Sequence, residues 1–165
     1  MILEPIARVD EGASWVGWQM DDASATKLTI RSTVAEAQKV QQAISEQVAA
    51  HGYSCDTNFA IRLSLDEALI NAIRHGNGDD PNRLITISYQ ITSETACIRV
   101  CDEGEGFTPN NIPDPTLDEN LEQPNGRGVM LMKAYMTEVH FNKRGNCVTL
   151  VKRRNCSLPN SPTCD

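Results

Sequence analysis

The stretch LDEALINAIRHG, residues 65–76, carries the pattern that decides the fold. It belongs to a helix that we predict from Asp56, its expected N-cap, to His75, with apolar residues on more than one side, as in a central, buried helix. Glu67, Asn71 and His75 recur at positions i, i+4 and i+8, so their side chains share one stripe. Burying an ionised carboxylate alone costs on the order of several kcal/mol, so the fold must supply a cation, a donor or a wet cleft. The stripe is a candidate site, with a solvated helix face as the alternative.

The residues before this helix predict a strand and a second helix. Residues 27–31, KLTIR, alternate apolar and polar side chains, which is typical of a short strand. Over residues 34–51 apolar side chains recur every three or four positions, and this spacing predicts an amphipathic helix. Thr33 and Glu36 have the spacing of a capping box at its start, and Gly52 ends it.

The residues after the central helix predict a sheet. Two strands, residues 84–91 and 96–102, are joined by a short polar loop, so we expect them to be antiparallel. Residues 130–136 predict a helix, and residues 138–142 and 147–152 predict a hairpin. Helices before an antiparallel sheet, with one more helix inserted, indicate an α+β fold, a two-layer α/β sandwich with its helices on one face.

The length of 165 residues fits one ordinary domain, and 40% hydrophobic residues with 10 glycines is a globular composition. We expect an N-terminal extension over residues 1–24, a folded domain over residues 25–154 and a flexible C-terminal tail over residues 155–165. The WVGW sequence at residues 15–18 fits an ordered extension, an edge strand or a partner-binding arm.

Charge and cysteine usage exclude several protein classes. A net charge of −7 repels phosphate backbones, which excludes a general nucleic-acid binder. The opening residues lack the basic start and apolar stretch of a signal peptide, and no run is apolar enough to span a bilayer. The six cysteines are scattered, so we expect free thiols in a reducing cytoplasm. A zinc site is disfavoured because no CxxC pair occurs.

The sequence DEGEGF, residues 102–107, directly follows a predicted strand. Its glycines allow the backbone to approach a ligand closely, and Asp102 at the strand end can accept a hydrogen bond from an amine. A tight acidic turn and a weak calcium loop are the alternatives for this stretch, although the spaced oxygen ligands of an EF-hand are missing.

The sequence GRG, residues 126–128, opens the third predicted helix. A helix N-terminus offers unsatisfied amides and a positive dipole end, and Arg127 adds charge, so this is a candidate phosphate site; a plain turn into the helix is the alternative. Residues 109–124 form too long an irregular stretch for an ordinary connector, and we expect a functional lid there. Neither a Walker motif nor a complete GxGxxG is present, which excludes the P-loop and Rossmann folds.

The order of these motifs, ExxxNAxxHG on a helix, DxGxGF after a strand, a lid and GRG at a helix start, resembles the N, G1 and G2 boxes of the Bergerat-fold (GHKL) ATPases. More narrowly, LDEALINAIRHG and the compact length resemble the bacterial anti-sigma-factor serine-protein kinases of the RsbW type. The resemblance covers about residues 27–153. It implies the Bergerat ATP-binding fold, with a mixed, mainly antiparallel sheet, and ATP and Mg2+ as ligands.

The resemblance also implies roles for single residues. Glu67 falls at the general base of the family, and Asn71 at its magnesium ligand, where an amide oxygen suits a hard cation that bridges phosphates. Asp102 matches the residue that accepts from the adenine amine, with Gly104 and Gly106 shaping the adenine pocket. The lid end that wraps the phosphates is matched by Gly126, Arg127 and Gly128.

The last hairpin departs from the family pattern. Many relatives have a threonine after the hairpin glycine that helps to hold adenine through water, whereas here Gly145 is followed by Asn146. Asparagine can also donate and accept, so we still expect nucleotide binding. No HExxxP phosphoacceptor pattern is present, and His75 is expected to be a pocket or core histidine.

Two function classes follow. The first is an ATP-dependent serine/threonine-protein kinase that acts as an anti-sigma factor, phosphorylating an anti-anti-sigma STAS-domain partner and sequestering a sigma factor. The second is a nucleotide-gated protein-binding module without phosphoryl transfer. The presence of Glu67 and Asn71 favours the kinase, because pure binding would tolerate losing the base. We also expect a homodimer, and neither nucleic acid nor membrane as a direct partner.

Overall fold

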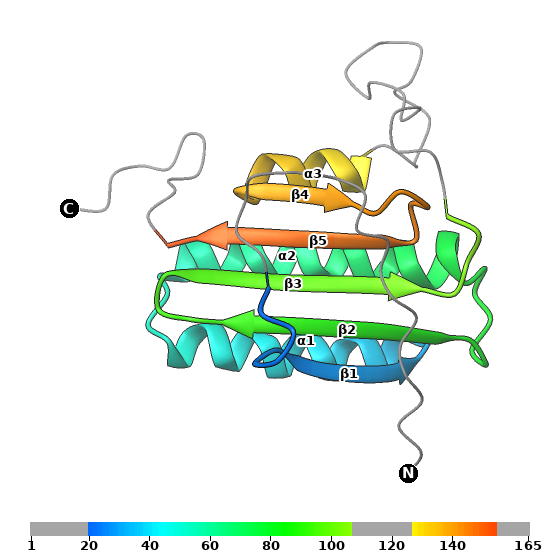
Figure 1. Ribbon diagram of the computed structural model, residues 1–165, viewed down its shortest axis with the longest axis horizontal. Helices are drawn as coiled ribbons and strands as arrows, with labels where there is room; N and C mark the ends of the chain where they lie inside the picture. The colour runs from blue at the N-terminus through cyan, green and yellow to red at the C-terminus, as the bar shows by residue number, and fades with distance from the viewer. Residues whose placement is uncertain (1–19, 107–126, 155–165) are drawn as a thin grey trace.

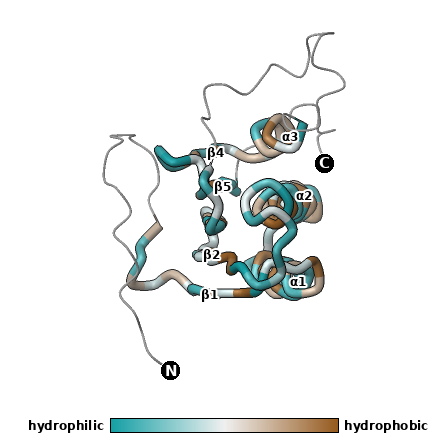
Figure 2. Tube along the Cα trace, turned by 90° about the vertical axis from the view of Figure 1, so that its right-hand side faces the viewer, coloured by the Kyte–Doolittle hydropathy of each residue, from teal (hydrophilic) through white to brown (hydrophobic). Residues whose placement is uncertain are grey.

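The computed structural model describes residues 20–106 and 127–154, which form a sheet with helices packed on one face (Figure 1). The chain order of the elements is β1 (Thr26–Arg31), α1 (Val34–Ala50), α2 (Cys55–Asn71), the π-helical turn η1 (Ala72–Gly76), β2 (Leu84–Ile91), β3 (Thr95–Asp102), α3 (Arg127–Tyr135), β4 (Glu138–Phe141) and β5 (Cys147–Arg153). Figure 2 shows the sheet edge-on with the three α-helices on the same side. The predicted α+β two-layer fold is confirmed.

The strand order in the sheet is β1-β2-β3-β5-β4. All four pairings between these strands are antiparallel, so the parallel component that a mixed sheet requires is missing among the described strands. β3 lies between β2 and β5, and its last residue, Asp102, pairs with Ile85 of β2. This central position brings the end of β3 between the start of β2 and the turn that leads into β5.

The core lies between the sheet and α1 and α2. Side chains alternate between the two faces of a strand, and every second residue of the central strands points toward the helices. Burial of these apolar side chains supplies the main favourable term in folding. The side chains at 2% exposure or less include Ile44, Val48, Ile61, Leu65, Leu69, Ile85, Ile87, Ile98, Val100 and Leu150.

The helix starts differ in detail from the predictions. Thr33 caps α1 as expected, because its Oγ1 accepts a hydrogen bond from the Glu36 backbone N–H at 3.3 Å. The Glu36 carboxylate instead pairs with Lys39 at 3.0 Å, so only this half of the capping box is seen. Ser54, not Asp56, is the N-cap of α2, and its Oγ accepts from the Thr57 N–H at 3.2 Å.

The prediction that α2 is buried on more than one side was too broad. α2 lies between α1 and α3 in the helical layer, but its outward face is open (Figure 2). Phe59 is 56% exposed and meets Tyr135 of α3 edge-to-face, and Ile70 is 38% exposed. Apolar residues on the second side of α2 therefore contact α3 or solvent instead of the sheet.

The opposite face of the sheet carries the segment that leads into β1. Met20 is buried there and packs with Cys97 and Val151. The rest of the predicted extension with its WVGW sequence, the predicted lid and residues 155–165 of the tail lie outside the described residues. The domain boundaries stay a prediction. No helix in residues 20–106 and 127–154 is both long and apolar enough to cross a membrane.

Candidate functional site

The predicted stripe on α2 holds for two of its three residues. Glu67 and Asn71 are partly buried on α2. The helix then widens into a π-helical turn, in which the Asn77 N–H donates to the Ala72 carbonyl at 2.8 Å, five residues back. Such a turn holds more residues than an α-turn and breaks the i, i+4 spacing. His75 was expected to be a pocket or core histidine; it is exposed, so the core alternative is wrong and the pocket alternative stays a prediction.

The first turn of α3 lies directly against the carboxylate of the stripe. Gly128 is buried, and a Cβ placed on it would lie 2.6 Å from Glu67 Oε2 and 3.3 Å from Asn71 Nδ2. A Cβ at this position would force the Glu67 carboxylate, the far end of a flexible side chain, to shift. The fold thus brings together two motifs that lie about 60 residues apart in sequence.

Asp102, the last residue of β3, forms the second part of the site. Its Oδ1 accepts a hydrogen bond from the Gly104 N–H at 2.8 Å. Partial burial raises the pKa of Asp102, against the lowering effects of that hydrogen bond and of the positive charges on Arg144 and Arg83. A carboxylate has about four acceptor positions, so Asp102 can accept further donors.

Glycines surround this carboxylate closely. A Cβ on Gly76 would overlap the Asp102 carboxylate, and a Cβ on Gly104 would overlap the Gly76 carbonyl. The π-helical turn at the end of α2 and the turn after β3 are therefore in direct backbone contact. The glycines predicted to shape a binding pocket are brought together with Asp102.

Gly106 packs against the turn between β4 and β5. Its φ of 82° is in the left-handed region, and a Cβ there would overlap the Arg144 carbonyl. Arg144 Nη2 donates to the Gly104 carbonyl at 2.9 Å. The turn that follows Asp102 is thus held between the end of α2 and the β4–β5 turn.

Asn146, the residue after the hairpin glycine Gly145, bonds to the protein itself. Its Nδ2 donates to the Asp102 carbonyl at 2.9 Å, and its own carbonyl accepts from the Asp102 N–H at 2.9 Å. The Asn146 Oδ1 accepts from Asn142 Nδ2 at 2.8 Å. These contacts position the backbone of Asp102.

Asn77 positions the turn after β3, a role that no sequence motif predicted. Its side chain is 2% exposed. Its Oδ1 accepts from the Glu103 N–H at 2.9 Å, and its Nδ2 donates to the Leu84 carbonyl at 3.0 Å. The sequence signal for this role is an asparagine directly after Gly76 and directly before Gly78, in a stretch that is typical of the end of a helix.

A disulfide corrects the expectation that all cysteines are free thiols. Cys101 on β3 is bonded to Cys147 on β5, whereas Cys55 is free and exposed and Cys97 is free and buried. Cys101 directly precedes Asp102, and Cys147 directly follows Asn146. The crosslink is therefore next to the predicted adenine-binding residue.

The structure describes only some residues of the predicted phosphate site and lid. Arg127 is the first residue of α3 and is exposed, whereas Gly126 and the predicted lid, residues 109–124, lie outside the described residues. In the described part of the chain, no group of three or more His, Cys, Asp or Glu side chains could hold a metal ion.

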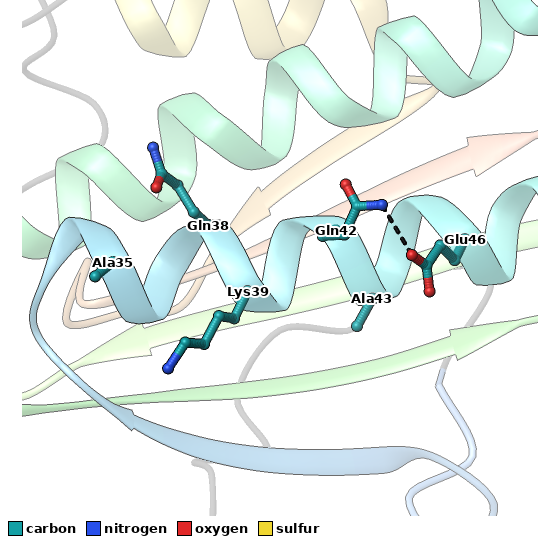
Figure 3. A pocket seen from close by; sticks show the side chains of 6 residues that line it. All are labelled: Ala35, Gln38, Lys39, Gln42, Ala43 and Glu46. Carbon is teal, nitrogen blue, oxygen red and sulfur yellow. Dashed lines mark hydrogen bonds between the residues drawn. The ribbon is translucent and has the colours of Figure 1, made fainter.

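An open depression along the outer side of α1 is lined by Ala35, Gln38, Lys39, Gln42, Ala43 and Glu46, with a hydrogen bond of 2.8 Å between Gln42 and Glu46 (Figure 3). It contains none of the predicted site residues.

Several known proteins are similar to this chain in sequence. Serine-protein kinase RsbW of Oceanobacillus iheyensis is 25% identical over 108 residues, which cover 62% of this chain and 68% of the relative. Serine/threonine-protein kinase BtrW of Bordetella bronchiseptica is 27% identical over 94 residues, 56% of this chain and 66% of the relative. Anti-sigma F factor of Geobacillus stearothermophilus is 31% identical over 113 residues, 64% of this chain and 73% of the relative. The kinase names confirm the predicted enzyme class, a serine/threonine-protein kinase.

A solved structure and a family profile place the fold. The crystal structure of the RsbU and RsbW domains of a Mycobacterium tuberculosis protein superposes with a TM-score of 0.55 at 18% identity, over 82% of this chain and 33% of that chain. The histidine kinase-like ATPase domain profile matches residues 30–152, about three quarters of the sequence. This chain therefore belongs to the histidine kinase-like ATPase domain family.

Proposed function

We propose that this chain is an ATP-dependent protein kinase that acts as an anti-sigma factor. It would phosphorylate a serine or threonine of an anti-anti-sigma STAS-domain partner. When it is not bound to that partner, it would sequester a sigma factor. The observation that carries this proposal is the contact of Gly128 with both Glu67 and Asn71, which joins the predicted base to the predicted phosphate-binding turn. The names of the kinase and anti-sigma relatives support it. A homodimer, a cytoplasmic location and the absence of nucleic acid and membrane partners remain predictions.

The nucleotide would lie between two groups of residues. Asp102 would accept a hydrogen bond from the adenine amine, while Gly104 and Gly106 let the backbone approach the ring. The phosphates would lie at the start of α3, where Gly126, Arg127 and Gly128 provide amides and a positive charge. The end of α2 connects the two groups, because Gly76 contacts Asp102 while Glu67 and Asn71 contact Gly128.

The donor set fits a magnesium ion bound mainly through phosphate oxygens. Asn71 would supply an amide oxygen, and the described residues offer no acidic cluster that would bind a metal without nucleotide. When bound, magnesium neutralises phosphate charge and so allows an acidic protein of net charge −7 to hold a nucleotide.

Glu67 would act as the general base. Phosphoryl transfer depends mostly on positioning and electrostatics, and a base that takes the proton of the attacking hydroxyl contributes about 10² to 10⁴ in rate. The Glu67 carboxylate lies beside the Gly128 turn, where the phosphates would bind, so it would be near a hydroxyl that attacks the γ-phosphate.

The test is transfer of the γ-phosphate from ATP to candidate STAS-domain proteins. Glu67→Gln is expected to bind ATP normally and to lower single-turnover transfer by about 10² to 10⁴. Asp66→Asn, the same chemical change one residue earlier on α2, serves as the matched control and is expected to transfer normally. Equal transfer by wild type and Glu67→Gln would remove the base assignment. ATP binding without transfer to any partner would favour the nucleotide-gated binding module.

A further inference from the structure

The Cys101–Cys147 disulfide joins two neighbouring strands at the edge of the proposed nucleotide site. The two residues face each other in the β3–β5 register, with their Cα atoms 4.1 Å apart. The adjacent backbone bond runs from the Asp102 N–H to the Asn146 carbonyl. Cys101 and Cys147 thus form a non-hydrogen-bonded antiparallel pair, the kind in which side chains lie closest.

Each end of the crosslink continues into residues that shape the turn after β3. Asp102 follows Cys101, and its carbonyl accepts from Asn146 Nδ2. Two residues before Asn146, Arg144 bonds to the Gly104 carbonyl. The disulfide therefore adds a covalent link to a turn that otherwise depends on a few hydrogen bonds.

The two cysteines of the disulfide lie outside the hydrophobic core. Cys101 and Cys147 are partly buried, on the sheet face opposite the helices, because the alternate residues Ile98 and Val100 point into the core. Cys97 lies on the same face but is buried under Met20. Burial raises the pKa of the Cys97 thiol to about 12, so this residue forms little thiolate and is a poor competitor in exchange.

We propose that Cys101 and Cys147 form a thiol–disulfide switch that sets the order of the turn after Asp102 and, through it, the affinity for adenine nucleotide. The nucleotide part of the inference rests on the proposed function. In the oxidised form the crosslink holds the turn in its binding geometry, so less ordering is needed when the nucleotide binds. In the reduced form the turn must become ordered when the nucleotide binds, and this lowers the affinity.

The switching reaction needs an external dithiol. A thiolate of the dithiol attacks one sulfur of the disulfide and forms a mixed disulfide, and the second thiol of the reductant then displaces the protein sulfur. Two electrons and two protons pass to the protein, Cys101 and Cys147 end as thiols, and the reductant leaves as a disulfide. Disulfides in reducing compartments are typically of this transient or sensing kind.

The test uses the full chain with Cys55→Ser, Cys156→Ser and Cys164→Ser, which leaves the pair and the buried Cys97. Peptide mass mapping verifies the Cys101–Cys147 link before and after treatment with a small dithiol. Two quantities are then compared between the forms: affinity for a fluorescent ATP analogue with Mg2+, and hydrogen exchange over residues 102–106 and 144–147. The control adds Cys101→Ser and Cys147→Ser, which keep the size of the side chains but cannot crosslink.

We expect reduction to weaken nucleotide affinity about three- to tenfold and to speed exchange over both segments. The double serine control should match the reduced form and should not respond to the dithiol. Equal exchange and equal affinity in both forms would overturn the switch while leaving the ATP site intact. If reduction speeds hydrogen exchange over both segments but neither form binds ATP, the switch in the turn is supported and the proposed function is overturned.

Discussion

Gly128 and Glu67 are in such close contact that a methyl group at position 128 would lie 2.6 Å from the Glu67 carboxylate oxygen. This contact lies at the point where the proposed base on α2 meets the proposed phosphate site at the start of α3. Because packed interiors do not deform continuously, a shift of the first turn of α3 must also move Glu67 or its surroundings. The position of α3 therefore controls the geometry of the base.

Gly128→Ala is expected to lower phosphoryl transfer strongly in a protein that still folds. The added Cβ forces the Glu67 carboxylate to move from its position, and because this is the flexible end of a long side chain the change should affect transfer more than stability. Single-turnover transfer and thermal unfolding should be measured together. The matched control is Ala134→Gly on the exposed side of α3, which costs about 1 kcal/mol through helix propensity without touching α2. Loss of transfer in both variants would show that general weakening of α3 is the cause.

Asn71→Ala is expected to abolish the magnesium dependence of nucleotide binding. The substitution removes the amide oxygen that we assign to the ion, so the ion would lose its proposed protein ligand. Calorimetry with and without a chelator measures the effect. Asn71→Asp keeps an oxygen ligand and should retain magnesium-dependent binding. If Asn71→Ala binds Mg-ATP as wild type does, Asn71 is not the metal ligand.

The sequence pattern predicted the elements well where periodicity and turn residues agree. β2 has the predicted bounds, residues 84–91, because polar and turn-forming residues flank an apolar run on both sides. The order of the three motifs also predicted which family the chain belongs to. The order of the motifs does not by itself predict contacts such as that of Gly128 with Glu67, which depend on the fold.

Other features depend on geometry that a linear pattern does not contain. The π-helical turn at Ala72–Gly76 differs from an α-turn by one residue, and apolar spacing over a single turn does not separate the two. Cys101 and Cys147 are 46 residues apart in sequence, and their pairing depends on the register of β3 and β5. The role of Asn77 depends on two backbone groups brought together only in the folded sheet.

Asn77→Ala is expected to weaken adenine nucleotide binding through the turn that holds Asp102. The variant leaves the Glu103 N–H and the Leu84 carbonyl without their side-chain partner, and such loss costs about 1 to 3 kcal/mol when the groups stay buried. Asn77→Asp keeps the acceptor for Glu103 and should restore part of the affinity. Comparing KM for ATP with kcat separates this positioning role from general instability, because a positioning defect raises KM. A fall in kcat alone would contradict it.

The last prediction concerns Asp102 and pH. Asp102→Asn removes a charge-assisted hydrogen bond of about 1.5 to 3 kcal/mol, so affinity for adenine nucleotides should fall about ten- to a hundredfold at neutral pH. Burial raises the pKa of Asp102, so its carboxylate becomes protonated at a higher pH than an ordinary aspartate, whose pKa is about 3.9. Protonation cancels the charge, so wild-type affinity should decline as pH falls through that raised pKa.

Folding has the opposite dependence, because a buried carboxylate is less stable when ionised. The unfavourable contribution of ionised Asp102 is present above its raised pKa and is relieved as pH falls toward the ordinary value. The nucleotide-free Asp102→Asn variant, which carries no charge there, should therefore unfold at a temperature no lower than wild type at neutral pH, although it binds nucleotide less well. Affinity for adenosine, which has no phosphates to titrate, should be measured against pH for both proteins. A parallel decline in wild type and variant would show that another group is responsible.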